Sequence, residues 1–356
     1  MADIDDKQAI KELDKAEMFS AIWDFPQQVR NAIGLGYKAE IEKVSAGSIN
    51  NIVVTGMGGS AIGGDLLGSF LSRELKAPMV VNRDYSLPGF VDEQSLVFVI
   101  SYSGNTEESL SAYAEALKKG AQIIAVSSGG KLSSQAKEDD NTLITVPGGL
   151  MPRAALGYLF FPLLIVMGRL GFCRIERDDL EKLTDLLEVW RENYRIELKE
   201  PKNKAKSIAR KLYNRLPIIY AGGKPFDVVG ARFKAQLCEN SKALSFNNVF
   251  PEFNHNELVG YENLPFSADR VAVLIIADKD DNPRTKKRMD IVRRMFRDKG
   301  IEVIRIKGEG AVKLERIFSL IQLADFSSFY LAIMYDCDPT VIEPIEFLKR
   351  ELAGFK

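Results

Sequence analysis

The sequence predicts an α/β protein made of two doubly wound, parallel-sheet domains preceded by a helical segment. Short β-branched runs alternate with helical stretches along most of the chain, which is typical of a parallel sheet with crossover helices. The order strand, glycine-rich turn, helix, strand, helix, strand occurs twice. In such sheets a ligand binds at the carboxyl ends of the strands, near the point where the strand order reverses.

We place the domain boundaries where the composition changes. An acidic, helical segment with an apolar face opens the chain, and a charged, helical stretch lies between the two repeats. The predicted parts are a helical segment at 1–44, a first α/β domain at 45–173, a helical bridge at 174–215, and a second α/β domain with a C-terminal helix at 216–356.

The charge balance narrows the range of partners. The 356 residues include 48 Lys and Arg against 49 Asp and Glu, a net charge of −1, which argues against nucleic acid or an anionic membrane as the main partner.

The three cysteines, Cys173, Cys238 and Cys337, are too few and too scattered for a disulfide framework or a zinc cluster. Because the acidic, helical N-terminus does not resemble a secretory signal, we predict a cytoplasmic protein.

One apolar segment, residues 154–170, resembles a membrane span in composition only. It is short for a bilayer, contains Pro162, and meets Arg169 before a full span is reached. We therefore predict a buried or subunit-interface helix here, and no membrane partner.

The first predicted strand leads into a glycine-rich motif. The β-branched run Ile52–Thr55 is followed by glycines that permit a tight turn, and then by a helix predicted over 61–73. Backbone N–H groups and the helix dipole converge at such a turn and form an anion site. Glycine spacing alone leaves two interpretations open, a dinucleotide fingerprint and a cradle for the phosphate of a small sugar. The turn residues concerned are Gly58, Gly59 and Ser60.

A second turn, after the strand Leu96–Ile100, distinguishes between these interpretations. It carries four hydroxyl side chains just before a helix predicted over 107–119, and such a turn suits a terminal phosphate. A dinucleotide site requires an acid after its second strand, and Met79–Val81 is followed only by an ambiguous Asn-Arg-Asp stretch. Ordinary helix capping would also place hydroxyls here. The hydroxyl residues are Ser101, Tyr102, Ser103 and Thr106.

Two further strands, Gln122–Val126 and Thr142–Val146, end in glycine turns and complete the first predicted sheet. The second copy of the pattern lacks the hydroxyl-rich turn, because residues 277–280 read Ala-Asp-Lys-Asp. We therefore predict one phosphate site per chain, in the first domain. The strands of the second copy are predicted at Ile218–Ala221, Val271–Ala277 and Ile301–Ile306.

Three side chains outside these turns are candidates for chemistry. Arg153 opens the apolar helix, where a cation opposes the helix dipole unless an anion lies close, although an ordinary surface arginine fits the same pattern. Glu239 lies on a predicted helical face, where glutamate is usually only solvated. His255, the single histidine, lies in an asparagine-flanked loop, where it either meets a ligand or is packed. Because no second His or Cys lies at ligand spacing, we expect no metal site.

Five motifs, spread in a fixed order over nearly the whole chain, resemble those of the archaeal and bacterial bifunctional phosphoglucose/phosphomannose isomerases. They are GMGGSAIGGD, SYSGNTEES, MPRAALGY, ENSK and EFNHNE. The C-terminal stretch 338–349 also resembles the terminal helix of that family, which carries a functional lysine, here Lys349. The resemblance implies two sugar-isomerase domains, each a flavodoxin-like, doubly wound sheet.

The resemblance also implies a reaction and its residues. These enzymes interconvert glucose 6-phosphate and mannose 6-phosphate with fructose 6-phosphate through a cis-enediol, without a redox cofactor or a metal. Glu239 would move a proton between C2 and C1, and Arg153 would stabilise the enediolate. His255 and Lys349 would open the sugar ring. The 6-phosphate would be held by Gly58, Gly59, Ser60, Ser101, Ser103 and Thr106.

The resemblance further implies a homodimer in which His255 reaches the site of the other subunit, with the apolar helix 154–166 as an interface element. The sequence spacing of His255 and Glu239 leaves open a site within one chain. Two other functions remain as alternatives. A non-catalytic sugar-phosphate sensor would need none of Glu239, Arg153 and His255, and an NAD-dependent oxidoreductase would show a change in cofactor absorbance.

Overall fold

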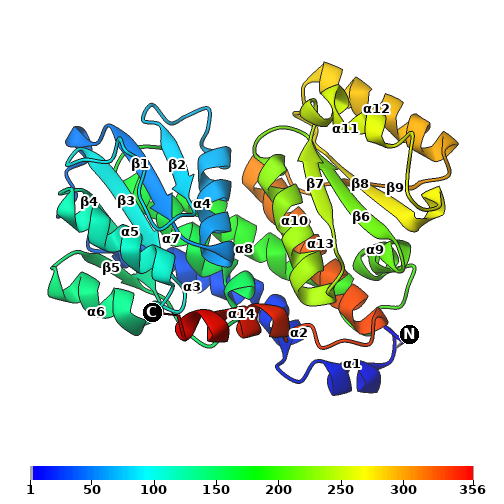
Figure 1. The fold of residues 1–356 in the computed structure, drawn as a ribbon, viewed down its shortest axis with the longest axis horizontal. Helices are drawn as coiled ribbons and strands as arrows, with labels where there is room; N and C mark the ends of the chain where they lie inside the picture. The colour runs from blue at the N-terminus through cyan, green and yellow to red at the C-terminus, as the bar shows by residue number, and fades with distance from the viewer. Residues whose placement is uncertain (1–2, 356) are drawn as a thin grey trace. The chain divides into compact units, whose positions relative to one another are not determined.

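The computed structural model describes residues 3–355, which form two compact units (Figure 1). The first unit is continuous, from Asp24 to Glu188. The second unit joins the start of the chain, up to Trp23, to the stretch that begins at Val189. These units divide the chain differently from the predicted boundaries, because the segment 1–44 and the bridge 174–215 are each shared between them.

The first unit consists of one parallel sheet with helices packed against it. Its elements are α3 (Phe25–Lys38), η1 (Ala46–Ser48), β1 (Asn51–Thr55), α4 (Gly58–Phe70), β2 (Met79–Asn82), β3 (Ser95–Ile100), α5 (Glu107–Lys118), β4 (Gln122–Ser127), α6 (Gly130–Glu138), β5 (Thr142–Thr145), η2 (Pro152–Ala154), α7 (Leu156–Arg169) and the start of α8 (Arg177–Arg191). The strand order is β2-β1-β3-β4-β5. Strands β1 and β3 are buried along their whole length, as expected of apolar strands in a parallel sheet.

All five strands predicted in the first sheet are confirmed, but two helices differ from the prediction. Helix α4 begins at Gly58, so the glycines of the turn form its first turn. Helix α6 was not predicted, because its short, polar sequence places only two apolar side chains, Leu132 and Ala136, in the core.

Helix α7 is buried from Leu156 to Met167 within its own unit. Helices α3 and α4 pack against it so closely that glycine is required at both contacts. A Cβ atom on Gly36 would lie 2.9 Å from Ile165 Cβ, and one on Gly63 would lie 2.3 Å from the carbonyl oxygen of Leu159. The prediction of a buried helix is confirmed, whereas the prediction that residues 154–166 form a subunit interface is wrong, because these side chains are already covered within the chain.

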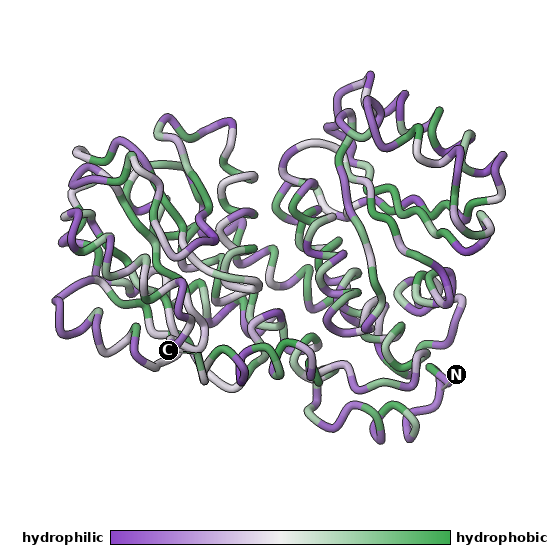
Figure 2. Tube along the Cα trace, viewed as in Figure 1, coloured by the Kyte–Doolittle hydropathy of each residue, from purple (hydrophilic) through white to green (hydrophobic). Residues whose placement is uncertain are grey.

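The second unit contains a four-stranded parallel sheet. Its elements are α1 (Lys7–Leu13), α2 (Met18–Trp23), the end of α8, η3 (Glu192–Tyr194), α9 (Lys204–Leu212), β6 (Leu216–Ala221), α10 (Phe226–Ser241), β7 (Phe246–Val249), η4 (Glu252–His255), α11 (Glu257–Gly260), η5 (Ala268–Arg270), β8 (Val271–Ala277), α12 (Pro283–Asp298), β9 (Glu302–Lys307), α13 (Lys313–Met334) and α14 (Glu343–Ala353). The order β7-β6-β8-β9 repeats β2-β1-β3-β4, which confirms the predicted internal repeat. Strand β7 was not predicted, because it is a partly exposed edge strand with two asparagines. Figure 2 shows hydrophobic residues along the strands of each sheet.

Helix α13 is the core helix of the second unit. It is long and apolar enough to cross a membrane by length and composition, but its whole apolar window is buried within the structure. Helices α2, α9 and α10 pack along it, and the ring of Phe19 on α2 lies 5.6 Å from that of Phe326 and 5.3 Å from that of Phe329. This contact assigns α2 to the second unit, whereas α3, the next helix in the chain, packs on α7 in the first.

A buried ion pair joins α10 to α13. The guanidinium of Arg232 pairs with the carboxylate of Asp325, and both side chains are less than one-tenth exposed. Arg232 Nη2 donates to Asp325 Oδ2 at 3.1 Å, and Gln236 Nε2 donates to Asp325 Oδ1 at 2.7 Å. These contacts fix the position along α13 of the helix that carries Glu239.

Candidate active site

The two predicted turns meet at the point where the strand order of the first sheet reverses. Strands β1 and β3 are neighbours, and their carboxyl ends lead into the glycine turn and the hydroxyl turn. A Cβ atom on Gly56 would lie 2.9 Å from the carbonyl oxygen of Ile100, and Ser60 Oγ accepts a hydrogen bond from the Tyr102 amide at 3.3 Å. The structure thus places the two turns side by side. The residues predicted to hold a phosphate lie on them and are Gly58, Gly59, Ser60, Ser101, Ser103 and Thr106.

Two hydroxyl groups of this site, those of Ser101 and Thr106, bond to each other. Ser101 is fully buried, and its Oγ donates to Thr106 Oγ1 at 2.9 Å. Thr106 is the N-cap residue of α5 without a side-chain capping bond, and Met57, the N-cap residue of α4, offers none either. Two helix N-termini without side-chain caps therefore converge on one spot, an arrangement that favours an anion.

Arg153 lies directly behind the glycine turn. A Cβ atom on Gly59 would lie 2.7 Å from the carbonyl oxygen of Pro152 and 3.0 Å from the amide nitrogen of Arg153, so only glycine permits this approach. The arginine is 5% exposed and is therefore no ordinary surface residue. The structure thus packs the backbone at Arg153, a buried residue, directly against the glycine turn.

Gln28 positions the backbone around Arg153, a role that was missed in the sequence. Its Nε2 donates to the carbonyl oxygen of Ala154 at 2.8 Å, and its Oε1 accepts from the Gly157 amide at 2.6 Å. The buried amide thus holds both sides of the junction between η2 and α7. No local pattern could have revealed this contact, because Gln28 comes from α3, more than a hundred residues earlier.

Tyr102, noted in the sequence only as one of four hydroxyls, has a positioning role. Its hydroxyl donates to the carbonyl oxygen of Pro147 at 2.8 Å and accepts from the Leu150 amide at 3.1 Å. Burial raises the pKa of Tyr102, which keeps the hydroxyl protonated as a donor. The side chain thereby ties the hydroxyl turn to the loop that leads to Arg153.

Glu239 and His255 lie at opposite ends of the strands of the second sheet. Helix α10 follows β6 and packs along it, so it runs back toward the amino ends of the strands. Glu239, half-buried, lies near its last turn, about 20 Å along the helix from Phe226. His255 ends η4, just beyond the carboxyl end of β7, and is exposed. Within one chain the structure does not bring these two side chains together.

Lys349 lies on α14, a helix whose residues 343–352 are all exposed. Its ammonium group has no hydrogen bond or ion pair within the described part of the chain. The same helix exposes Ile345, Leu348 and Leu352 at helical spacing. The second unit alone therefore does not assign Lys349 to a site.

The corresponding turns of the second sheet are filled by a side chain. Gly222 follows β6 as Gly56 follows β1, and a Cβ atom there would lie 2.3 Å from Asp281 Oδ1. The other carboxylate oxygen of Asp281 accepts from the Asp278 amide at 2.7 Å. An internal carboxylate thus occupies the place where the first sheet has its anion-suited turns, in agreement with the predicted loss of the hydroxyl turn.

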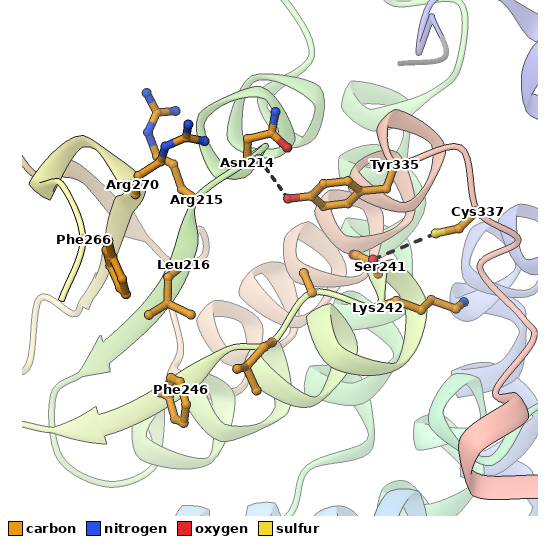
Figure 3. Close-up of a pocket in the computed structure, with 12 residues that line it drawn as sticks. Asn214, Arg215, Leu216, Ser241, Lys242, Phe246, Phe266, Arg270, Tyr335 and Cys337 are labelled. Carbon is orange, nitrogen blue, oxygen red and sulfur yellow. Dashed lines mark hydrogen bonds between the residues drawn. The ribbon is translucent and has the colours of Figure 1, made fainter. Parts of the chain in front are cut away.

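A cavity of about 790 Å³ lies at the amino ends of the strands of the second sheet (Figure 3). Leu216, Phe246 and Phe266 line its apolar side, and the Tyr335 hydroxyl accepts from the Asn214 amide at 2.9 Å on another side. None of the predicted site residues is among the described residues that line it. Within residues 3–355 no cluster of three His, Cys, Asp or Glu side chains is placed to hold a metal ion.

Comparisons with known proteins match both sheets. Residues 48–148 match the family model of the SIS domain, and residues 201–352 match that of the bacterial phospho-glucose isomerase C-terminal SIS domain. The bifunctional phosphoglucose/phosphomannose isomerase of Caldicellulosiruptor bescii is 44% identical over 95% of this chain and 100% of its own length. That of Aquifex aeolicus is 38% identical over 85% of this chain and 90% of its own length.

A solved structure shows the same fold at low identity. The glucosamine-6-phosphate deaminase of Thermotoga maritima superposes with a TM-score of 0.68 at 17% identity, over 90% of this chain and 96% of that one. The family models cover both sheets, and the two relatives align with most of the chain. The chain therefore belongs to the family of bifunctional phosphoglucose/phosphomannose isomerases.

Proposed function

We propose that this protein is an aldose–ketose isomerase that interconverts glucose 6-phosphate and mannose 6-phosphate with fructose 6-phosphate through a cis-enediol. The observation that carries the proposal is the contact of Gly59 with the backbone of buried Arg153. It packs an anion-suited turn against the backbone of a buried arginine, which supports a role for this arginine in a reaction through an anionic intermediate. Membership of the isomerase family supports the same reaction.

The 6-phosphate is assigned to the two adjoining turns. Backbone N–H groups at the start of α4 and the hydroxyls of the second turn supply donors to its oxygens, and the two helix dipoles favour its charge. Holding the sugar by this end fixes where C1 and C2 lie, which makes proton transfer effectively intramolecular. The residues proposed for this role are Gly58, Gly59, Ser60, Ser101, Ser103 and Thr106.

Glu239 is assigned as the base that removes the C2 proton of the aldose and returns it to C1. Arg153 donates to the enediolate oxygens, a role that is most effective where water is excluded, as it is around this side chain. His255 and Lys349 exchange protons with O5 and O1 when the ring opens. Since the atoms and electrons of product and substrate balance, we assign no redox cofactor. The family resemblance implies no metal, and we assign none.

A common intermediate accounts for the two aldoses. Glucose 6-phosphate and mannose 6-phosphate differ only in the configuration of C2, and this carbon is planar in the cis-enediol. A base that can reach C2 from either epimer therefore forms the same intermediate and the same ketose. We further propose that the enzyme works in the cytoplasm, since its three cysteines are free.

The test is a coupled assay of the purified protein with each hexose 6-phosphate, with and without EDTA. We expect turnover of both aldoses to fructose 6-phosphate, at rates that EDTA does not change. Binding of the sugar phosphates without turnover would contradict the isomerase and favour a sensor.

Replacing Gly104 by alanine should raise KM for the sugar phosphates at least about tenfold, because the hydroxyl turn must open. Gly104 has a φ of +71°, and a Cβ atom there would lie 1.8 Å from the carbonyl oxygen of Gly129. Gly47→Ala is the matched control, since no atom lies within 4 Å of its added methyl group. If steady-state kinetics give equal KM values for the two variants, the phosphate of the substrate does not bind at this turn.

We also propose that the enzyme is a homodimer in which His255 serves the site of the partner subunit. Two observations support this arrangement. His255 is exposed, and within its own chain it lies at the other end of the strands of the second sheet from Glu239. A solvent-exposed imidazole beyond a strand end is available to a second chain, while the base lies elsewhere.

Mixing two inactive variants tests the shared site. Glu239→Gln and His255→Ala chains are co-refolded, so that a mixed dimer has one site with both lesions and one intact site. Random pairing puts about half of the dimers in this class, so about a quarter of the wild-type activity should return. If mass measurement confirms mixed dimers and the mixture stays inactive, each site is built from one chain.

A further inference from the structure

A second, smaller cavity lies at the carboxyl ends of β8 and β9, away from every residue assigned to the isomerase reaction. Its volume is about 300 Å³, within the range of a site for a small metabolite. Nine residues line it, and five of them are cationic. The cationic residues are Lys279, Lys286, Arg305, Lys307 and Arg316.

The two arginines are already paired with carboxylates. Arg316 Nε donates to Asp278 Oδ2 at 2.7 Å, and the same guanidinium reaches Asp280. Arg305 Nη1 donates to Asp290 Oδ1 at 3.0 Å. A nearby carboxylate, that of Asp281, accepts from the Asp278 amide and also interacts electrostatically with Lys286 and Arg305.

The three lysines have no carboxylate within ion-pair distance in the part of the chain that the structure describes. Lys279 Nζ donates to the neutral carbonyl oxygen of Ala311 at 2.7 Å, and Lys286 Nζ donates to that of Lys279 at 2.5 Å. The side chain of Lys307, which is exposed, has no hydrogen bond or ion pair in that part of the chain. Three ammonium groups thus line one cavity without an ion pair to a carboxylate of the described residues, and Lys286 also interacts electrostatically with the Asp281 carboxylate.

An unused donor is present among the lining residues. Arg305 Nε is buried and has no hydrogen-bond partner among the described residues, which is costly for a charged group. Gly308 and Gly310 also line the cavity. A Cβ atom on Gly308 would lie 2.5 Å from the carbonyl oxygen of Arg316, so packing against α13 requires this glycine. Helix α12, which contributes Lys286, is rich in arginine and lysine and adds to the positive potential.

We propose that this cavity binds the phosphate group of a small metabolite, or inorganic phosphate itself. A phosphate dianion would neutralise two of the lysine charges and offer an acceptor to a nearby donor such as Arg305 Nε. The site differs from the one proposed for the substrate, because it lies between β8 and β9 and not at the point of strand-order reversal, which Asp281 fills. The chain would thus bind a second phosphate in addition to its substrate.

Calorimetric titration of the full-length protein with inorganic phosphate, at fixed ionic strength, tests the proposal. Wild-type protein should bind two phosphates per chain. Lys279→Gln/Lys307→Gln should weaken one of these sites at least tenfold and leave kcat for the hexose 6-phosphates unchanged. Lys287→Gln/Lys299→Gln is the matched control, since both side chains are exposed and neither lines the cavity.

Two further variants keep the outcome decisive. Lys307→Gln alone removes a charge with no intrachain contact to lose, so its weaker binding cannot be ascribed to a misfolded loop. Gly104→Ala should weaken the other phosphate and leave this one intact, which separates the two sites. If Lys307→Gln and the double variant bind two phosphates as tightly as the control, the proposal is overturned, whatever the isomerase assay shows.

Discussion

Replacing Glu239 by glutamine is expected to lower kcat by about 10²–10⁴-fold with both aldose 6-phosphates. Glutamine keeps the shape of the side chain but cannot accept the C2 proton. Because the proposed function assigns substrate binding to the phosphate site and not to this group, KM should change much less than kcat. Steady-state kinetics with each aldose measures both effects.

Isotope exchange distinguishes loss of the base from a general defect. In D₂O the wild-type enzyme should introduce deuterium at C2 of the aldose and C1 of the ketose, and the Glu239→Gln variant should not. Glu138→Gln, an exposed residue at the end of α6, is the control for the substitution itself. Turnover or exchange near the wild-type rate in the Glu239 variant would exclude this residue as the base.

Replacing Asp325 by asparagine is expected to lower the free energy of unfolding of the second unit by about 3–5 kcal/mol. The substitution removes the charge of Asp325 from beside the buried guanidinium of Arg232 while keeping the size of the side chain. Both tryptophans of the chain, Trp23 and Trp190, belong to this unit, so their fluorescence in a urea titration reports its unfolding.

An exposed ion pair provides the contrast. Lys43 and Asp140 are paired at the surface of the first unit, where a salt bridge contributes little. Asp140→Asn should therefore leave its unit as stable as in the wild-type protein. If Asp325→Asn lowers the free energy of unfolding of the second unit no more than Asp140→Asn lowers that of the first, the buried pair does not hold α10 to α13.

The fold was largely predictable because its central strands are short, apolar and β-branched. The elements that were missed lack this local signal: α6 is short and polar, and β7 carries two asparagines at a sheet edge. The unit boundaries could not be predicted, since sequence adjacency does not decide which core a helix covers. For the same reason, the apolar composition of α7 predicted burial but not whether its own chain or a partner covers it.

The residues of the candidate site also fall into those that the sequence could predict and those that it could not. The two turns are local, and glycines and hydroxyls after a strand have a direct physical meaning, so their residues could be named from the sequence. Gln28 and Asp281 could not be, because the buried Gln28 amide acts across 126 residues and Asp281 fills a turn formed after a different strand. Which residues support a site depends on packing between distant segments.

The discontinuous second unit has a consequence for synthesis on the ribosome. The first unit is one unbroken stretch, so it can fold once Glu188 has left the exit tunnel. Phe19 and the rest of α2 emerge before it, yet the helix they pack against, α13, is among the last to be translated. The nascent chain therefore carries an apolar helix without its partner through most of translation, and a chain that stops short of α13 leaves that helix permanently exposed to aggregation and proteolysis.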